Sequence, residues 1–212
     1  MKSVRRELAG RVLRRPGVDK FDERRSELAR AALETLSELG YARTGLREIA
    51  KASGFSHGVL HYYFADKYEL IIFCVRQYKA VCVKRYDEVV ESAKTAAQLR
   101  KGFAAAMVAT LEADAAMHRL WYDVRTQSLF EAHFQADVAE IDGSLRRMVW
   151  RIVTEYARLS GKRPAVDADF AYALFDGVFE HALLKHLYGD PQAGAQLSTH
   201  VMRLLEGPVL RK

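Results

Sequence analysis

Histidines at helical spacing are the first residues whose types suggest chemistry. His57 and His61 stand four residues apart, which places two side chains on one helical face and is compatible with metal binding. No acidic residue or cysteine nearby completes a zinc site, and we therefore expect no metal. His133 and Asp137 have the same spacing, and we interpret them as a surface pair.

Motifs for catalysis or cofactor binding are absent from the sequence, which contains no Gly-x-Ser-x-Gly elbow, phosphate-binding loop or dinucleotide fingerprint. Its two cysteines, Cys74 and Cys82, stand eight residues apart on one expected helix. At ~1.5 Å per residue they are ~12 Å apart, whereas a disulfide needs Cα atoms within about 7 Å. We therefore expect reduced core thiols, no cofactor and no enzymatic activity.

Composition and charge favour a globular protein with a basic N-terminal arm. The chain has 212 residues, 50% hydrophobic and 28% charged, and its longest strictly apolar run, residues 103–109, is far shorter than a membrane span of ~20 residues. No secretory signal can be drawn, so we expect a cytoplasmic protein without membrane contact. Residues 1–20 carry seven basic and two acidic side chains, nearly all of the net charge of +6. This arm, expected to be flexible, would attract nucleic acid or an anionic membrane, or it is a solvated tail.

The pattern of apolar residues predicts an all-α fold of about nine helices. Almost every segment repeats with helical period, and no alternating strand pattern is bounded by turn residues. Pro16-Gly17 is expected to interrupt any helix that precedes residue 21. An N-terminal three-helix module should therefore pack on a larger C-terminal helical bundle. The expected helices cover residues 21–39, 46–53, 57–64, 67–91, 95–113, 115–130, 134–159, 167–188 and 192–206.

Residues 44–67 have the pattern of a helix-turn-helix, in which one helix braces on the DNA backbone while the next enters the major groove. A tight turn at Gly54 joins the two helices, and Ser56 is a good N-cap for the second. Gly58 costs that helix about 1 kcal/mol relative to alanine, which indicates close approach of a phosphate or, alternatively, of another helix. The expected buried seam is Ile49, Ala50, Phe55, Leu60 and Phe64, which leaves His57, Gly58, His61 and Tyr62 facing outward.

The stretch from residue 21 to residue 70 resembles the DNA-binding region of TetR/AcrR transcriptional regulators. The matching positions are Ala31-Ala32-Leu33-Glu34, Gly40-Tyr41, Ile49-Ala50, Gly54, Ser56, Gly58, Leu60, Tyr63-Phe64 and Lys67. The resemblance implies that Thr44 and Lys67 meet phosphates and that the recognition helix begins at His57. The implied DNA-contacting residues are Thr44, Arg47, Ser56, His57, Gly58, Val59, His61, Tyr62 and Lys67. Gly45, His57 and His61 depart from the family's usual residues, so the operator sequence does not follow.

Aromatic and polar residues on the middle and late helices suggest a ligand pocket. Such a mixture can line a largely apolar cavity with a few orienting polar groups, although aromatics at helical spacing also form an ordinary core. The family resemblance favours the pocket. The expected ligand-binding residues are Phe103, Met107, Trp121, Tyr122, Arg125, Phe130, His133, Phe134, Phe175 and Phe179.

Residues 167–188 are apolar on more than one face, so one face can pack in the bundle while another meets a partner. Together with the final helix, this segment resembles the family's four-helix homodimer interface, which would pair two recognition helices on a palindromic site. The alternative is a central helix buried in a monomer. The expected interface residues are Phe170, Leu174, Gly177, Val178, His181, Leu197 and Val201.

These observations lead us to expect a homodimeric regulator, most simply a repressor that a small-molecule effector releases from double-stranded DNA. The expected division is an arm at residues 1–20, a DNA-binding domain at 21–66 and a ligand-binding and dimerisation domain at 67–212. An aromatic, acyl or cationic amphiphile would fit as effector. The alternatives are a helical enzyme that uses His133, Asp123 or His181, and a helical adaptor or anionic-surface binder that uses the arm.

Overall fold

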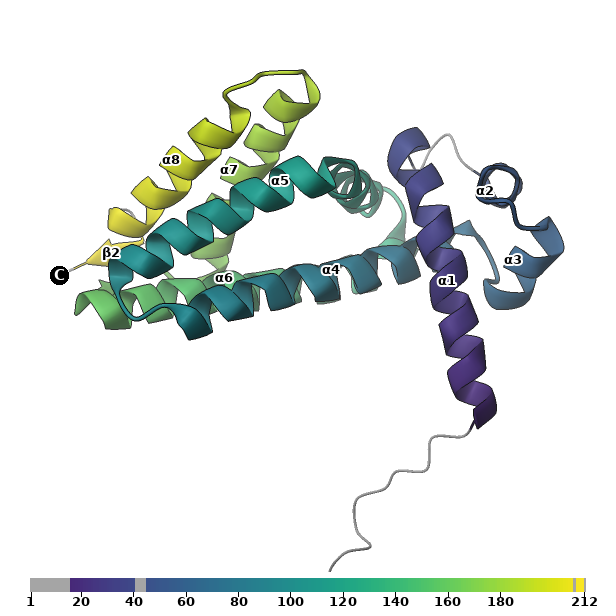
Figure 1. The fold of residues 1–212 in the computed structure, drawn as a ribbon, viewed down its shortest axis with the longest axis horizontal. Coiled ribbons are helices and arrows are strands. Elements are labelled where there is room, and N and C mark those ends of the chain that lie inside the picture. Colours follow the sequence, from purple (N-terminus) through teal and green to yellow (C-terminus); the bar gives the residue numbers. More distant parts are fainter. Residues whose placement is uncertain (1–15, 41–44, 208, 212) are drawn as a thin grey trace, which may run out of the picture.

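The computed structural model describes residues 16–40, 45–207 and 209–211, and this part of the chain is almost entirely helical (Figure 1). Eight α-helices and one 3-10 turn, η1 (Ala132–Phe134), make up the described fold. Two two-residue strands, β1 (Arg163–Pro164) and β2 (Leu210–Arg211), pair antiparallel and were not predicted. The helices are α1 (Pro16–Leu39), α2 (Leu46–Ser53), α3 (His57–Tyr63), α4 (Lys67–Ser92), α5 (Ala96–Gln127), α6 (Gln135–Ser160), α7 (Ala168–Leu187) and α8 (Ala193–Glu206).

Helix boundaries follow local capping signals. The side chain of Asp66 accepts a hydrogen bond from the Glu69 amide at 2.8 Å and so begins α4. Thr95 and Asp167 cap α5 and α7 in the same way. Gly161 ends α6 with φ of 64°, a left-handed conformation that glycine adopts without strain. The predicted all-α architecture is confirmed.

Two predicted interruptions are wrong in detail. Helix α1 begins at Pro16, because proline fits the first helical position, where its missing amide needs no partner. The arm expected at residues 1–20 therefore ends earlier, and residues 1–15 lie outside the described part. The break expected between residues 113 and 115 is a kink within α5, where Asp114 has φ of −124° and ψ of 22°. The Asp114 carboxylate accepts a hydrogen bond from Arg85 on α4 at this kink.

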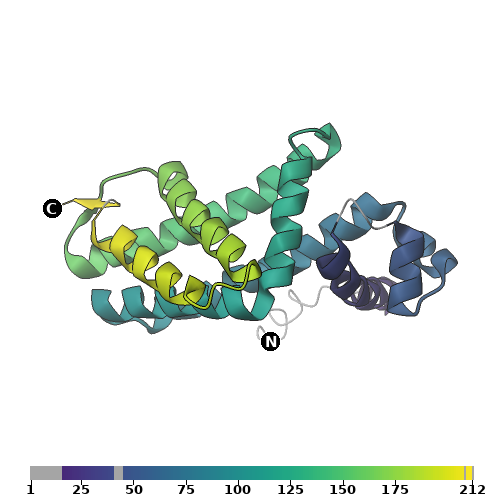
Figure 2. The same cartoon turned by 90° about the horizontal axis from the view of Figure 1, so that it is seen from above.

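The molecule has two parts joined by α4, as Figures 1 and 2 show from two directions. Helices α1, α2 and α3 form a module at one end. At the other, α5 and α6 pack on α4, α7 packs on α5 and α6, and α8 packs on α5 and α7. The module's core is apolar, with Leu28, Leu36, Ile49, Leu60 and Leu70 buried. Because Leu70 belongs to α4, the module is completed by the first turns of the helix that enters the bundle.

Polar contacts also fix α1 on α4. The guanidinium of Arg25 lies 4.9 Å from the ring centroid of Phe64 and 4.5 Å from that of Phe73, and it pairs with Glu69. The Cys74 thiol donates to the carbonyl of Ala29 at 3.2 Å. These contacts make the module's position depend on the start of α4.

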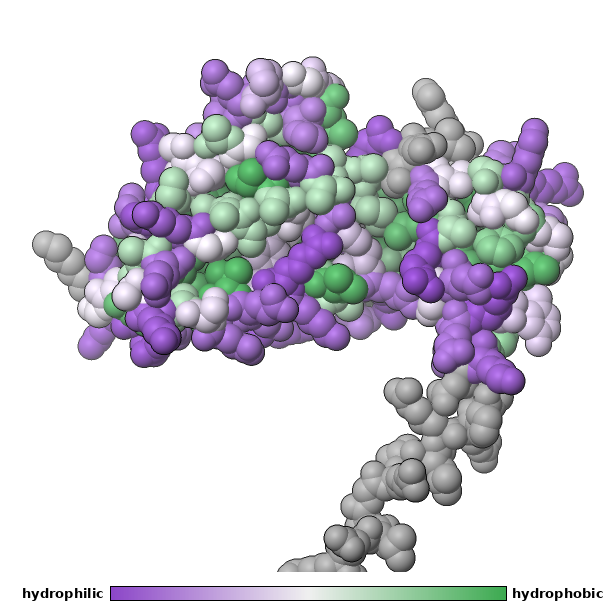
Figure 3. All heavy atoms as spheres, in the orientation of Figure 1, coloured by the Kyte–Doolittle hydropathy of each residue, from purple (hydrophilic) through white to green (hydrophobic). Residues whose placement is uncertain are grey.

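Hydrophilic side chains cover most of the face drawn in Figure 3, with hydrophobic patches between them. Within the ranges that the structure describes, no helix combines the length and apolarity that crossing a bilayer requires.

Candidate DNA-binding surface and ligand cavity

The helix-turn-helix is built from local signals at Gly54 and Ser56. Gly54 ends α2 with φ of 73°, and the Ser56 hydroxyl accepts a hydrogen bond from the Val59 amide at 3.2 Å to begin α3. Leu60 is fully buried, which turns the opposite side of α3 outward. The predicted turn and second helix therefore lie where the sequence puts them.

The predicted DNA-contacting residues lie mostly on the outer face of the module. Exposed members of the set are Arg47, Ser56, Gly58, His61 and Tyr62. The Tyr62 side chain is 72% exposed and its ring stands 6.0 Å from that of Phe21, so α1 supports it from one side. Half-buried members are His57, Val59 and Lys67, and Thr44 lies outside the described residues.

Gly58 has no internal reason to be glycine. A Cβ built there meets nothing within 4 Å, so the alternative of a close helix crossing inside the protein is excluded. His57 packs edge-on against His61, with 4.3 Å between ring centroids. In the described residues, no three His, Cys, Asp or Glu side chains gather as a metal site would require.

A cavity lies between α4, α5, α6 and α7, with an empty volume of about 530 Å³ that is partly open to solvent. Six of the residues predicted for ligand binding line it, namely Phe103, Met107, Trp121, Tyr122, Phe175 and Phe179. Ten others were not predicted, namely Lys79, Cys82, Tyr86, Thr110, His118, Leu145, Met148, Val149, Tyr172 and Asp176.

Three residues predicted for ligand binding lie away from the cavity, which corrects the expectation. Phe130 is 81% exposed and His133 is also exposed, both in the connection between α5 and α6. Phe134 is buried, but its ring packs 4.6 Å from that of Tyr68, in the first turn of α4. This connection lies at the module end of the bundle, beyond the helical segments that form the cavity wall.

One side of the cavity wall carries a buried amine and a buried imidazole. Lys79 is only 4% exposed, and its Nζ lies 3.2 Å from Nδ1 of His118. Burial lowers the pKa of Lys79 to about 8, and burial together with the Lys79 charge lowers the pKa of His118 well below 6.5. At pH 7 an ammonium therefore donates to a neutral ring, whose Nε2 then donates to the Tyr78 hydroxyl at 3.0 Å.

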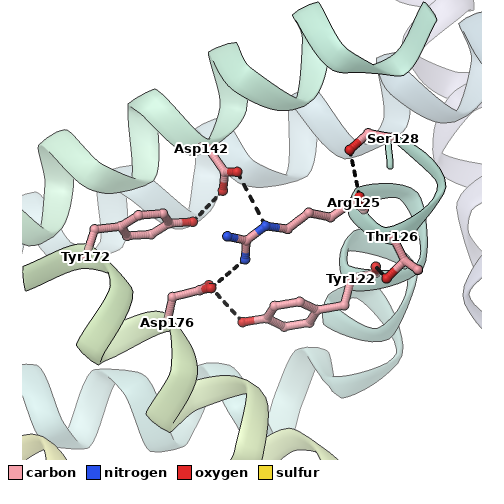
Figure 4. Close-up of polar contacts among 7 residues, drawn as sticks. All are labelled: Tyr122, Arg125, Thr126, Ser128, Asp142, Tyr172 and Asp176. Atoms are coloured by element: carbon pink, nitrogen blue, oxygen red, sulfur yellow. Dashed lines mark hydrogen bonds and ion pairs between the residues drawn. The ribbon is translucent and has the colours of Figure 1, made fainter. Parts of the chain in front are cut away.

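Beside the cavity, Arg125 lies between two carboxylates (Figure 4). The guanidinium of Arg125 pairs with Asp176 and, at 3.4 Å, with Asp142. The hydroxyl of Tyr122 donates to Asp176 at 3.0 Å, and that of Tyr172 donates to Asp142 at 2.5 Å. Burial and the nearby Asp176 raise the pKa of both tyrosines, so both remain donors. Arg125 thus does not line the cavity but holds the Asp176 that does.

A sequence signal for Lys79 exists in the periodicity of α4. Ile72, Val75, Cys82 and Tyr86 are buried at helical spacing, and Lys79 stands in the middle of that stripe. Lysine is rarely buried unless it is paired. Its place in this apolar stripe therefore indicates a buried polar site in the bundle.

The outer face of α7 carries the exposed part of the predicted dimer interface. Phe170, at 55% exposure, lies there with Gly177 and His181. Leu174 and Val178 flank this face and are half-buried. The other exposed large apolar residues of this stretch are Leu184, Leu187 and Tyr188.

Leu197 and Val201 are wrong as exposed interface residues. Both are 0% exposed within the single chain, because the apolar side of α8 packs on α5 and α7. The side of α8 that remains accessible carries residues such as Thr199 and His200. Polar residues of α8 therefore flank the apolar face of α7.

Comparison with known proteins finds likeness over both parts of the chain. The family model described as "Bacterial regulatory proteins, tetR family" matches residues 28–72. The HTH-type transcriptional repressor KstR2 of Mycobacterium tuberculosis is 22% identical over 192 residues, which cover 90% of this chain and 95% of KstR2.

Two solved structures share the fold. The transcriptional regulator FadR of Bacillus subtilis, in complex with stearoyl-CoA, has a TM-score of 0.69 and 20% identity over 86% of this chain and 97% of its own. A putative transcriptional regulator of Saccharomonospora viridis, in complex with choline, has a TM-score of 0.73 and 15% identity over 90% of this chain and 100% of its own.

The family match spans α2, α3 and the parts of α1 and α4 that pack on them. The longer likenesses extend through the bundle, and the similar proteins are transcriptional regulators rather than enzymes. Residues 28–72 therefore match the tetR family of bacterial regulatory proteins, and the chain as a whole is similar to transcriptional regulators that share its fold.

Proposed function

We propose that this protein is a ligand-responsive repressor that binds operator DNA as a homodimer and leaves it when a small molecule occupies the cavity. One observation carries the proposal: α4 is a continuous helix of 26 residues that serves both sites. Its first turns bury Leu70 and Cys74 against the DNA-binding module, and its later turns place Lys79 and Cys82 in the cavity wall.

DNA binding is assigned to the outer surface of α2 and α3. The exposed side chains of Arg47, His61 and Tyr62 give this surface a cation, an imidazole and a phenol, which suit contacts to phosphates and base edges. Gly58 leaves room for a phosphate to approach the helix backbone. We divide the chain functionally between residues 66 and 67, with α1 to α3 as the DNA-binding domain.

Homodimerisation is assigned to α7 and α8. Among the described residues, nothing covers the apolar face around Phe170 and Leu184, and Gly177 allows a second helix to approach closely. A twofold axis there would present two copies of α3 to a palindromic site. A monomer would leave this apolar face exposed to water, and an adaptor would have no use for the helix-turn-helix.

Ligand response requires that the effector bind more tightly to the conformation that does not fit DNA. By linkage, operator DNA then weakens effector binding by the same factor. Solved proteins of this fold hold stearoyl-CoA or choline, which supports assigning the cavity to a small molecule. Movement of α4 is the simplest connection, because the cavity wall and the module share that helix.

The test begins with purified protein and a library of random duplexes, from which the protein selects its preferred sequence. Fluorescence anisotropy then compares the wild type with Tyr62→Ala, which should lose about tenfold or more in affinity for the selected duplex. Phe130→Ala removes an equally exposed aromatic outside the module and should bind as the wild type does. Failure to select any duplex, or equal binding by both variants, would refute the proposed DNA-binding surface.

A further inference from the structure

The polar groups of the cavity differ in whether their hydrogen-bonding capacity is used. Two carboxylates near Lys79 already have partners: Asp176 accepts from Tyr122 and pairs with Arg125. Asp142 likewise accepts from Tyr172 and pairs with Arg125. A ligand cation would therefore have to compete with Arg125 and the two tyrosines for these carboxylates.

The amine side of the cavity has donors without acceptors. An ammonium offers three N–H donors, whereas the nitrogen acceptor beside Lys79 is His118 Nδ1, at 3.2 Å. In the ranges the structure describes, no carboxylate oxygen comes within the 4.0 Å of an ion pair with Lys79. The indole nitrogen of Trp121, another wall residue, is buried without any acceptor.

In the described part of the chain, no neighbouring group forms a direct ion pair with the ammonium, because Asp176 and Asp142 attract it from a distance and each is paired with Arg125. Burial raises the pKa of the Cys82 thiol, which therefore stays neutral beside the ammonium. The rings of Trp121 and Tyr78 have centroids 5.3 Å and 5.7 Å from Nζ and make cation–π contacts, but they carry no net charge. A buried ammonium without a direct ion-pair partner is unfavourable, so an anionic oxygen brought by a ligand would be favoured here.

The remainder of the wall is suited to a hydrocarbon body. Phe103, Met107, Val149, Phe175 and Phe179 contribute apolar surface to the same cavity. A ligand that matches both regions has a single anionic oxygen group at one end and an apolar chain or ring at the other.

We propose that the effector is an apolar carboxylic acid, bound as its carboxylate to Lys79 with its hydrocarbon part along the aromatic wall. This inference rests on the proposed function, because it assigns the ligand class of the same cavity. A quaternary ammonium ligand is disfavoured, since it would face the Lys79 charge and would compete with Arg125 for Asp176 and Asp142.

The experiment measures direct binding by calorimetry to the full-length wild-type protein at pH 7. One probe series has a constant alkyl chain and three heads: octanoate, octanamide and octyltrimethylammonium. A second series has an aromatic body: 4-phenylbutyrate and 4-phenylbutyramide. Each carboxylate is expected to bind at least tenfold more tightly than its amide, and the ammonium compound should bind most weakly. Equal or tighter binding by the amides or the ammonium compound, or no binding by either carboxylate, would overturn the proposal.

A matched pair of lysine variants locates the effect. Lys79→Met should reduce the carboxylate preference over the amide to within about twofold while amide binding persists. Lys84→Met removes an exposed lysine from the same helix and should keep the full preference. A preference that survives Lys79→Met would overturn the assignment to Lys79, and if that variant does not fold, the wild-type probe series alone decides.

Release of the selected duplex distinguishes the two proposals. If the carboxylates bind in calorimetry but do not release the protein from the duplex, the ligand class is supported and the proposed effector-induced release from DNA is contradicted. Release by octanamide or octyltrimethylammonium, without tighter carboxylate binding, would support the response and overturn the ligand class.

Discussion

Replacing Lys79 by methionine is expected to stabilise the ligand-free protein at neutral pH. The pKa of this amine falls from 10.5 to about 8 on folding, chiefly through burial. The charges of Asp176 and Asp142 oppose the fall, and the charge of Arg125 adds to it. At 1.36 kcal/mol per pKa unit, keeping the amine charged in the fold costs about 3 kcal/mol. Methionine has a similar length and no charge to bury, so the variant avoids this cost.

The pH dependence follows from the lowered pKa of Lys79. Between pH 8 and 10.5 the unfolded chain binds more protons at this amine than the folded chain, so wild-type stability rises with pH there. The cost is fully present below pH 8. The advantage of Lys79→Met should therefore be about 3 kcal/mol at pH 7 and about 1 to 2 kcal/mol at pH 9.5.

Urea unfolding followed by circular dichroism measures this difference, with equal protein concentrations because a dimer's stability depends on concentration. Lys84→Met serves as the control, since its exposed amine should give the wild-type pH profile. A Lys79→Met protein that is less stable than the wild type at pH 7, or whose advantage does not change with pH, would refute the reasoning.

Three further predictions concern the arm, the dimer and the module. Residues 1–15 carry six basic side chains and one acidic side chain. Deleting them should reduce the slope of log DNA affinity against log salt concentration by several units, because each phosphate contact contributes about 0.9. An unchanged slope would exclude DNA contacts by the arm. Phe170→Glu should give monomers in light scattering while Phe130→Glu stays dimeric, and a dimeric Phe170→Glu would exclude this face as the interface. Arg25→Met should lower the free energy of unfolding by about 1 to 2 kcal/mol, because two cation–π contacts and the pairing with Glu69 are lost; wild-type stability in urea would contradict this.

Most helix ends could be predicted because they are determined within a few residues. Asp66, Thr95 and Asp167 each accept from an amide three residues later, and glycine at position 161 adopts the left-handed conformation. Such signals do not depend on which elements meet in the folded chain. The helix-turn-helix was predictable for the same reason.

The errors arose where distant contacts decide. Asp114 bends α5 instead of ending it, and its partner Arg85 comes from α4. The β1–β2 pair joins residues 163–164 to residues 210–211, a separation that local periodicity cannot detect. Pro16 is the exception, because its position is decided locally: proline fits the first turn of α1 and does not interrupt the helix.

The cavity was predictable in its aromatic part only. Helical periodicity shows which residues face inward, but it does not show which inward faces leave space between them. Phe130 and Phe134 were therefore grouped with Phe103 and Phe175, although the former lie at the other end of the bundle. The polar half of the wall was missed because Lys79 and His118 acquire their roles only when α4 and α5 pack together.

The same buried charge that weakens the ligand-free fold can supply the energy of the response. Without a ligand, the fold bears a cost of about 3 kcal/mol for the Lys79 ammonium. A bound carboxylate removes most of that cost only in conformations that bring α4 and α5 into position around it, so its affinity differs between conformations. A difference of this size corresponds to a shift of about 100-fold in a conformational equilibrium. Helix α4 also forms part of the core under α3. A ligand that binds more tightly to one position of α4 therefore also favours one position of the DNA-binding module.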